Sequence, residues 1–525
     1  MGIVEETVRE RRLWLLVFAT GIIVGLLLRF QLASYARMPG HGDSAFYYTV
    51  AKNIASGRGP VVDYIVYFFG GLLPLPHYAG DFWNPTASFL IAIPMLLFGR
   101  NISAALIAPI VAGILPAVAG FLAGQKYSGS LAAGVLTGLL TFFCAFQVWF
   151  SVTTEAIIFA GAFGSLAIYF MMRDRASGCY FLLAAIFTGL ANLVRQDNIL
   201  LLVTLEICVL AAALPWRKKL RIVLAAAAIH LLVLSPLLLT NYTELHTVFP
   251  AGPGKTAFLT TYEDFHSYNK TIDWKTLRAT WGIMGIIKRR LHTASENLDQ
   301  VQYFLTPLLM LLTVVALVDS LLVHRDKNQL WLLLPAAIFA LLEYAFYTVI
   351  ASFSGPGSLI KSLGTLMPFI SMVLVGFFAR YIQNRAWLAL AVAVVAGYSA
   401  YQGYSKNLDS TVYYNGVYQQ YEQVRSTILA DALSRGLPPD GIVVLARDTW
   451  DVAEGTGFKA VMVPNNDVNT IVDVAEHYGA HYILLPAKRP QLDKIYTGVT
   501  PDPRFRYMAS IPGSGLKIFR LDFEP

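Results

Sequence analysis

Long apolar stretches separated by short polar connections make up most of the chain between residues 13 and 402. A helix needs roughly 20 apolar residues to cross the hydrocarbon core of a bilayer, which is about 30 Å thick. By this measure the pattern predicts about eleven spans, some of them short: residues 13–32, 102–124, 129–150, 156–172, 180–194, 199–214, 222–240, 301–323, 330–351, 362–379 and 387–402. The predicted fold is therefore a polytopic α-helical membrane protein with additional interfacial helices.

Composition supports this class. Hydrophobic residues make up 56% of the chain and charged residues only 14%, too few to cover the surface of a soluble protein of this length. The net charge of +7 would suggest nucleic-acid binding in a soluble protein. Here the basic residues fall in short clusters between apolar stretches, so they indicate membrane topology and we expect no nucleic-acid partner.

The apolar stretch 86–98 decides the predicted topology. It is too short for a comfortable span, and we interpret it as an interfacial or re-entrant helix. The basic clusters at 173–175, 216–221, 324–327 and 380–385 then share the side of the N-terminal arginines. The positive-inside rule makes that side cytoplasmic, in a multi-pass protein of the plasma (inner) membrane. The connections 33–99 and 241–300 and the C-terminal tail are predicted to lie outside.

The hydrophobic pattern changes near residue 404. An amphipathic helix is predicted at 413–435 and another helix at 467–478. Short apolar runs predict strands at residues 442–446, 460–463, 482–485, 507–511 and 516–521. This alternation predicts a small extracytoplasmic α/β domain at 404–525, following a membrane module at 1–403.

Five charged residues lie at the predicted outer ends of the spans: Asp43, Glu155, Arg195, Asp197 and Lys361. Charges near the hydrocarbon core are costly and are usually paired and functional. Because the spans that carry these residues can gather in space, we expect the five side chains to form one site on the outer face.

Each of these residues also has a structural interpretation. Asp43 can cap the amphipathic helix predicted at 44–55, and Glu155 can favour the dipole of the helix that follows it. Arg195 and Asp197 can form a structural ion pair at a helix end. Lys361 can extend to the membrane interface while its stem stays in the apolar region.

Several motifs support a family resemblance. They are GDSAFYYTVAKNIASGRG at 42–59, Asn84-Pro85-Thr86, Thr154-Glu155-Ala156, GLANLVRQD at 189–197, and Lys361 followed by Pro368. In order and predicted sidedness they resemble the GT-C superfamily of membrane glycosyltransferases, in the branch of the protein mannosyltransferases and the aminoarabinose transferase of lipid A. The chain departs from that pattern where Lys361 and Ser362 replace the Arg-Tyr pair of the family.

The resemblance implies a GT-C-like fold and a polyprenyl-phosphate-linked sugar as donor, transferred to a protein, lipid or envelope-glycan acceptor on the outer face. Glycosyl transfer needs a base for the acceptor hydroxyl and positive charge at the departing phosphate. We expect Asp43 to be the base, and Glu155 to orient it, hold the acceptor or share a divalent cation with it. Arg58, Lys361, and Arg195 with Asp197 are the expected substrate contacts.

Two alternatives stay open. The cofactor is unknown, and a divalent metal ion would have Asp43, His41 and Glu155 as its candidate ligands. A transporter or flippase of a lipid-linked anionic sugar would also need many helices and cations. The absence of an internal hydropathy repeat, the acids at helix ends and the large outer loop favour an enzyme over a transporter.

Overall fold

The computed structural model describes residues 7–324, 326–353, 358–487 and 489–523. These residues form two compact units, each built from separate stretches of the chain. Unit 1 comprises Met1–Tyr35, Ser103–Thr243 and Ile287–Asp409, and unit 2 comprises Ala36–Ile102, Glu244–Ile286 and Ser410–Pro525.

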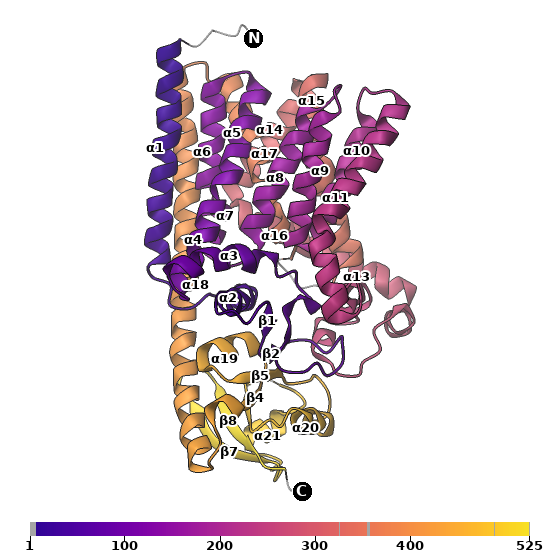
Figure 1. The fold of residues 1–525 in the computed structure, drawn as a ribbon. Coiled ribbons are helices and arrows are strands. Elements are labelled where there is room, and N and C mark those ends of the chain that lie inside the picture. Colours follow the sequence, from indigo (N-terminus) through magenta and orange to yellow (C-terminus); the bar gives the residue numbers. More distant parts are fainter. Residues whose placement is uncertain (1–6, 325, 354–357, 488, 524–525) are drawn as a thin grey trace. The chain divides into compact units, whose positions relative to one another are not determined.

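Unit 1 is a bundle of apolar helices (Figure 1). Its helices are α1 (Val8–Ala33), α4 (Ile102–Ala112), α5 (Ile114–Ser128), α6 (Leu131–Phe143), α7 (Ala145–Phe150), α8 (Ile157–Arg173), α9 (Cys179–Val194), α10 (Ile199–Ala211), α11 (Trp216–Leu245), the end of α13 (Trp274–Leu305), α14 (Pro307–Val318), α15 (Lys327–Ala345), α16 (Ser358–Ser362), α17 (Met367–Tyr381) and the start of α18 (Arg385–Ser434). Short turns interrupt or extend these helices. They are the 3₁₀ turns η2 (Gln196–Asn198) and η7 (Leu363–Thr365) and the π-helical turns η5 (Asp319–Val323) and η6 (Phe346–Ile350).

The length and composition of the helices confirm a multi-pass membrane protein. Within the described residues five helices are long and apolar enough to cross a bilayer, or six if the pair Ser358–Thr365 and Met367–Tyr381, bent by 60°, is one span. Shorter apolar helices of 10–17 residues supply further predicted spans, among them Ile157–Arg173 and Cys179–Val194. The number of about eleven crossings remains a prediction.

Small residues allow close packing of the first helices. A Cβ atom at Gly120 of α5 would lie 2.6 Å from Thr141 Oγ1 of α6, and one at Gly138 would lie 2.8 Å from the Ala117 carbonyl oxygen. Association of helices within a membrane depends on such packing because lipid is as apolar as the side chains. These glycines therefore allow the backbones of α5 and α6 to lie close to each other.

The basic clusters of unit 1 meet at one end of its helices. The contacts that connect them are Arg385 to Glu10 (3.4 Å), Arg380 to Asp319, Arg175 Nη1 to Asn328 Oδ1 (2.9 Å) and Ala213 N to Arg175 O (3.1 Å). This is the common side that the sequence predicts for them, and Arg325 of one cluster lies outside the described residues.

The directions of the first helices bear on the short helix α3 (Thr86–Phe98). Gly21 contacts Leu139 and Gly25 contacts Phe142, so α1 and α6 run in the same direction, while α5 and α6 are antiparallel neighbours. Thus α1 ends and the α4–α5 segment begins at the same end of unit 1. An even number of crossings must connect them, which supports the prediction that α3 does not cross.

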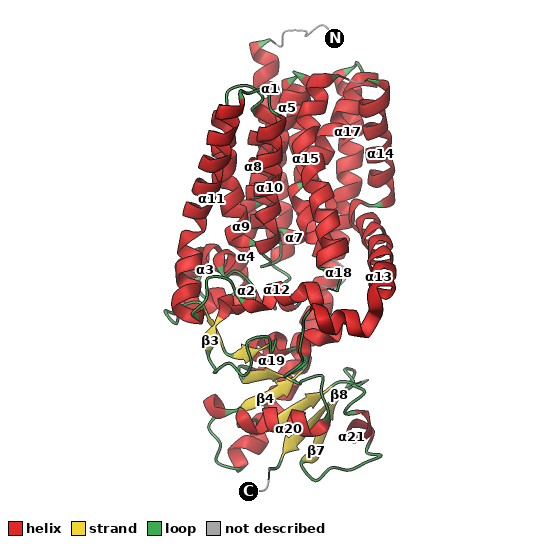
Figure 2. Cartoon of the chain, turned by 90° about the vertical axis from the view of Figure 1, so that its right-hand side faces the viewer, coloured by secondary structure: helices red, strands yellow, loops and turns green. Residues whose placement is uncertain are grey.

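Unit 2 contains a mixed six-stranded sheet (Figure 2). Its elements are α2 (Gly42–Ala55), β1 (Val61–Val62), β2 (Tyr64–Ile65), β3 (His77–Tyr78), α3, α12 (Ala251–Lys255), η4 (Tyr262–His266), β4 (Val443–Ala446), α19 (Thr449–Thr456), β5 (Lys459–Met462), α20 (Val468–His477), β6 (Tyr482–Leu485), α21 (Asp493–Thr497), β7 (Phe505–Ile511) and β8 (Leu516–Leu521). The strand order is β2-β5-β4-β6-β8-β7, parallel from β2 to β6 and antiparallel beyond it.

The sheet confirms the strands predicted after residue 440 and adds an unexpected one. Strand β2 comes from the first outer connection, and Tyr64 and Ile65 pair with Ala460 and Val461 of β5. The domain boundary predicted near residue 404 does not coincide with a break in secondary structure, because the single helix α18 continues from Arg385 to Ser434. The units thus group 36–102 and 244–286 with the C-terminal residues, and an independent domain at 404–525 remains a prediction.

The predicted sidedness can be tested by thiol labelling in intact cells. Native Cys179 is exposed and lies at the basic end of unit 1, whereas residue 101 precedes the α4–α5 segment at the other end. We expect a membrane-impermeant maleimide to label an Asn101→Cys variant from outside and to label Cys179 only after permeabilisation. Labelling of Cys179, but not of position 101, from outside would refute this topology.

Candidate functional site

Four of the five predicted charged residues come together in unit 1. Glu155 lies just before α8, and its Oε2 is 3.2 Å from Lys361 Nζ of α16. The Glu155 side chain is 1% exposed and that of Lys361 is 20% exposed. The lysine is therefore held by a buried acid, and part of its surface remains accessible to a ligand.

The neighbouring residue Ser362 links this pair to Asp197. Asp197, on the 3₁₀ turn η2, accepts hydrogen bonds at Oδ2 from Ser362 Oγ (3.1 Å) and from the Tyr347 hydroxyl (2.5 Å). Arg195 binds the same carboxylate through Nε (3.2 Å) and Nη2 (2.6 Å). Besides Arg195 of the same turn, two segments that are more than 100 residues later in the chain thus reach this carboxylate.

Close backbone contact fixes the position of Lys361 and Ser362. A Cβ at Gly161 of α8 would lie 3.1 Å from the carbonyl carbon of Gly364, and one at Gly164 would lie 2.7 Å from Thr365 Oγ1. The turn η7 can approach α8 this closely only because both positions on α8 are glycine. The approach brings Lys361 to Glu155, which directly precedes α8.

Two residues of this cluster were not predicted from the sequence. Tyr347 lies on the π-helical turn η6, and π-helical turns are frequent at functional sites. Glu343 of α15 is 2% exposed, and Asp197 and Arg195 are its electrostatic neighbours. Glu343 could have been predicted as a functional residue, because it is an acid inside an otherwise apolar stretch. For Tyr347 no comparable signal existed.

Asp43 belongs to unit 2 and occupies the second position of α2. The N-cap of this helix is His41, whose Nδ1 accepts a hydrogen bond from the Asp43 backbone N–H (3.3 Å). The expected capping role of Asp43 is therefore wrong in its detail, because the cap lies two residues earlier than the sequence suggested. An acid in the first turn still interacts favourably with the helix dipole.

Helix α19 fixes α2 along its length. The Trp450 indole lies against Gly42, where a Cβ would overlap it. One helical turn further along α19, Glu454 accepts hydrogen bonds from Lys52 (2.7 and 2.6 Å) and from Thr49 Oγ1 (3.1 Å). Together with the packing of α2 on α3, these contacts with α19 fix the position of α2 and of Asp43.

Aromatic side chains surround the region after α2. Tyr67 stacks on His266 with ring centroids 5.8 Å apart and contacts Phe82 at 4.4 Å. Burial, then the neighbouring Tyr262 and the Asp43 carboxylate, raise the pKa of Tyr67 well above its usual range. Its hydroxyl therefore remains protonated and can only act as a neutral hydrogen-bonding group at physiological pH.

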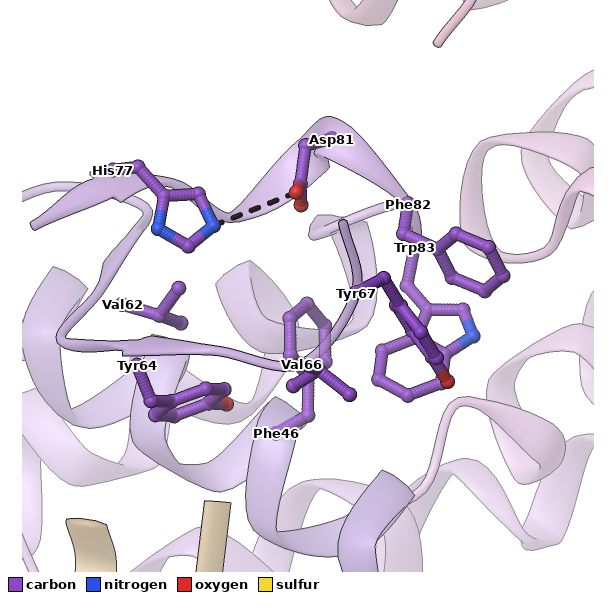
Figure 3. A pocket seen from close by; sticks show the side chains of 9 residues that line it. All are labelled: Phe46, Val62, Tyr64, Val66, Tyr67, His77, Asp81, Phe82 and Trp83. Atoms are coloured by element: carbon purple, nitrogen blue, oxygen red, sulfur yellow. Dashed lines mark ion pairs between the residues drawn. The ribbon is translucent and has the colours of Figure 1, made fainter. Parts of the chain in front are cut away.

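A small cavity lies beside this aromatic cluster (Figure 3). His77 and Asp81 face each other across its edge, with 3.5 Å between Nε2 and Oδ2, and Tyr64 and Trp83 line it. Its volume of about 20 Å³ suffices for a single water molecule. The cavity is therefore too small to hold a sugar.

Arg58 has a local role. It follows the C-terminal end of α2 and forms a bidentate pair with Asp63, at 2.7 and 2.8 Å. The helix between Asp43 and Arg58 is about 20 Å long at 1.5 Å per residue. We therefore leave Arg58 out of the proposed phosphate contacts.

The residues suggested for a metal do not form a complete ligand set. Within the described ranges no three His, Cys, Asp or Glu side chains are grouped as metal ligands. His41 already uses Nδ1 as an acceptor in the helix cap, so that nitrogen is not available to a metal ion.

Comparison with known proteins agrees with this architecture. A family model described as dolichyl-phosphate-mannose-protein mannosyltransferase matches residues 83–239. Among curated proteins no match was found. ArnT from Cupriavidus metallidurans, solved with bound undecaprenyl phosphate, has a similar structure with a TM-score of 0.55 at 14% identity, over 97% of this chain and 98% of ArnT.

Two structures of an archaeal oligosaccharyltransferase are also similar. The apo form from Archaeoglobus fulgidus has a TM-score of 0.55 at 13% identity, over 91% of this chain and 70% of that chain. AglB from the same organism, in complex with an inhibitory peptide and a dolichol-phosphate, has a TM-score of 0.50 at 12% identity, over the same shares of the two chains. The chain therefore has the fold of the GT-C membrane glycosyltransferases.

The buried His266 makes the stability of unit 2 depend on pH. Burial, and then the nearby Arg447, lower the pKa of His266 to about 4 from 6.5. Between pH 6.5 and 4 the unfolded chain binds a proton that the folded chain does not, so stability falls as the pH falls. At pH 5 the loss from this group is about 2 kcal/mol relative to pH 7.

We expect a His266→Phe variant, which keeps the ring but cannot titrate, to lose less stability than wild type between pH 7 and 5. The measurement is hydrogen-exchange protection of β4 and β5, corrected for the intrinsic pH dependence of exchange. The raised pKa values of Asp448 and of the buried Asp451 act in the opposite direction but cancel in the comparison. The exposed His477→Gln variant is the control, and equal slopes for His266→Phe and wild type would contradict the assignment.

Proposed function

We propose that this chain, which has the GT-C fold, is a membrane glycosyltransferase that transfers a sugar from a polyprenyl-phosphate donor to an acceptor on the extracytoplasmic face. The observation that carries the proposal is the cluster in unit 1, where the cations Arg195 and Lys361 are held by the buried acids Asp197 and Glu155. Two proteins of the same fold bind a polyprenyl phosphate, namely undecaprenyl phosphate in ArnT and dolichol-phosphate in AglB. This supports the donor class.

The proposed reaction needs one proton acceptor and one stabilised leaving group. The acceptor hydroxyl oxygen forms a bond to the anomeric carbon, and the bond from that carbon to the phosphate oxygen breaks. Asp43 takes the hydroxyl proton, and the polyprenyl phosphate leaves with the bonding electron pair. Asp43 suits this role because α19 fixes its helix and its carboxylate is half-buried.

Arg195 and Lys361 are the proposed contacts for the phosphate. Their side chains are 16% and 20% exposed, so both are preorganised by buried acids and accessible from outside the protein core. Preorganised charge of this kind stabilises a leaving group without reorganisation during the reaction. Glu155 and Asp197 position the two cations, and in this proposal Glu155 acts through Lys361.

The proposal places the N-terminus in the cytoplasm and unit 2 outside the membrane. The acceptor is then a protein, a lipid or an envelope glycan that is reached from the extracytoplasmic side. Mass spectrometry of envelope glycans and glycoproteins after deletion of the gene would identify both the sugar and the acceptor by the modification that disappears.

The alternative function, transport of a lipid-linked anionic sugar, makes a different prediction in a reconstituted system. A glycosyltransferase releases polyprenyl phosphate in proportion to the sugar that appears on an acceptor. A flippase moves the intact donor between leaflets with no change in its covalent structure. Accumulation of free polyprenyl phosphate therefore separates the two functions.

An Asp43→Asn variant tests the proposed base. The substitution keeps the size of the side chain but removes its charge, so we expect transfer to fall by about 10²–10⁴-fold while donor binding persists. Asp467→Asn is the matched control, because Asp467 is the exposed N-cap of α20 and asparagine caps equally well. If both variants turn over alike at matched thermal stability, Asp43 is not the base.

An Arg195→Lys variant separates phosphate binding from a structural ion pair. Lysine keeps the charge but cannot form the bidentate contact, so we expect the KM for the lipid donor to rise about 10- to 100-fold with little change in the KM for the acceptor. Arg175→Lys, at the basic end of unit 1, is the control. Lower thermal stability with an unchanged donor KM would show that Arg195 has only a structural role.

A further inference from the structure

A second cationic region of unit 1 lies far from the proposed donor site. A cavity of about 530 Å³ opens between the start of α9 and the start of α11. Leu182 of α9 lines it on one side, and Arg217, Lys218, Arg221 and Ile222 of α11 line it on the other. Leu182 is 13 residues from Arg195 along α9, which corresponds to about 20 Å of helix.

Three cations of this cavity share one face of α11. Arg221 follows Lys218 by three residues and Arg217 by four, so its side chain is a neighbour of both on the helix surface. All three are exposed, and in the described part of the chain none of them has an ion-pair partner. The adjacent Lys219 instead donates a hydrogen bond to the Leu210 carbonyl oxygen (2.5 Å).

This concentration of positive charge is unfavourable without a counter-ion. Like charges at a spacing of three or four residues repel each other, and the first turn of α11 contains no acid. The positive end of the helix dipole adds to the repulsion. An anion in the cavity would offset both the mutual repulsion of the cations and the effect of the helix dipole.

The remainder of the cavity is apolar. Leu182, Ile222 and Ala225 form its lining below the cations, and Ile222 is 7% exposed. The same helix presents Trp216, at 67% exposure, and Leu224, at 62%, to its surroundings. Because α11 is apolar enough to cross the membrane and only 22% of its most apolar stretch is buried, we expect these exposed side chains to face lipid. The ligand must therefore combine an anionic group with an apolar tail.

The location of the cavity indicates which lipid is available. The Ala213 amide, just before α11, donates to the Arg175 carbonyl oxygen (3.1 Å), so the cavity belongs to the basic end of unit 1. The predicted topology makes this the cytoplasmic end. Anionic glycerophospholipids give the cytoplasmic leaflet its negative surface potential, and basic pockets between helices on that side bind their headgroups.

We propose that this cavity binds an anionic glycerophospholipid of the cytoplasmic leaflet. Arg217, Lys218 and Arg221 contact the headgroup phosphate, and the acyl chains lie along Leu182, Ile222 and Ala225. The bound lipid stabilises the junction of α9 and α11. The proposal does not depend on the proposed enzymatic function, because the site uses none of the residues assigned to the donor or to the base.

The test measures lipid retention by the full chain. Wild type is reconstituted in nanodiscs of phosphatidylethanolamine with phosphatidylglycerol and then examined by native mass spectrometry. We expect one retained phosphatidylglycerol that is lost from the triple variant Arg217→Gln, Lys218→Gln, Arg221→Gln, whose affinity falls by about a hundredfold. The control is Arg9→Gln, Arg11→Gln, Arg12→Gln, which removes the same charge from the first turns of α1.

Thermal stability gives a second measurement. Phosphatidylglycerol should raise the Tm of wild type and of the α1 control, but not that of the triple variant in α11. Equal retention and equal Tm shifts in the two variants would overturn the site. Displacement of the lipid by millimolar inorganic phosphate would identify a free-anion site, and selective retention of polyprenyl phosphate over phosphatidylglycerol would assign the cavity to the carrier lipid. Either result would overturn the proposal.

Discussion

The buried carboxylate of Asp197 must be paired, and this requirement determines how unit 1 is arranged at the end opposite its basic clusters. An ionised acid that is only 9% exposed must be paired, and Asp197 is paired by Arg195, Tyr347 and Ser362 from three segments of the chain. Ser362 cannot reach Asp197 unless α16 and η7 lie against α8. Once they do, the adjacent Lys361 lies beside Glu155. One buried acid thus fixes the position of both cations proposed to bind the phosphate.

A comparison with Arg29 shows why pairing alone does not make a binding site. Arg29 of α1 is 0% exposed and donates to Ser151 Oγ (2.7 Å) and to the Phe142 and Gly25 carbonyl oxygens (2.5 and 3.0 Å). It holds α1 against α6 and the end of α7, and a ligand cannot reach it. Arg195 and Lys361 are also held by several contacts, but unlike Arg29 they are partly exposed. Accessibility, added to preorganisation, distinguishes a candidate phosphate contact from a structural cation.

The sequence predicted the parts of this structure that depend on local pattern. Strands 482–485 and 516–521 agree to the residue, and the convergence of Glu155, Asp197 and Lys361 follows from the rule that charges at membrane depth seek partners. Strand β2 was not predicted, because it consists of only two residues and pairs with β5, which lies almost 400 positions later in the chain. Such a pair leaves no signal in the local sequence pattern. The single helix α18 was predicted as two helices because its sequence changes from apolar to polar near residue 404, while its backbone stays helical.

The long-range pairing of β2 also changes how the C-terminal residues can be understood. Helix α2 takes its position from Trp450 and Glu454 of α19, and the connection after α2 joins the sheet through β2 and β5. The first outer connection therefore packs against the C-terminal residues through both α2 and β2. Deletion of the C-terminal residues would therefore remove these contacts from the segment that carries Asp43, even if those residues contributed nothing to bond formation. A loss of activity in such a truncation would report on the support of α2, so only point substitutions on α2 and α19 can separate chemistry from positioning.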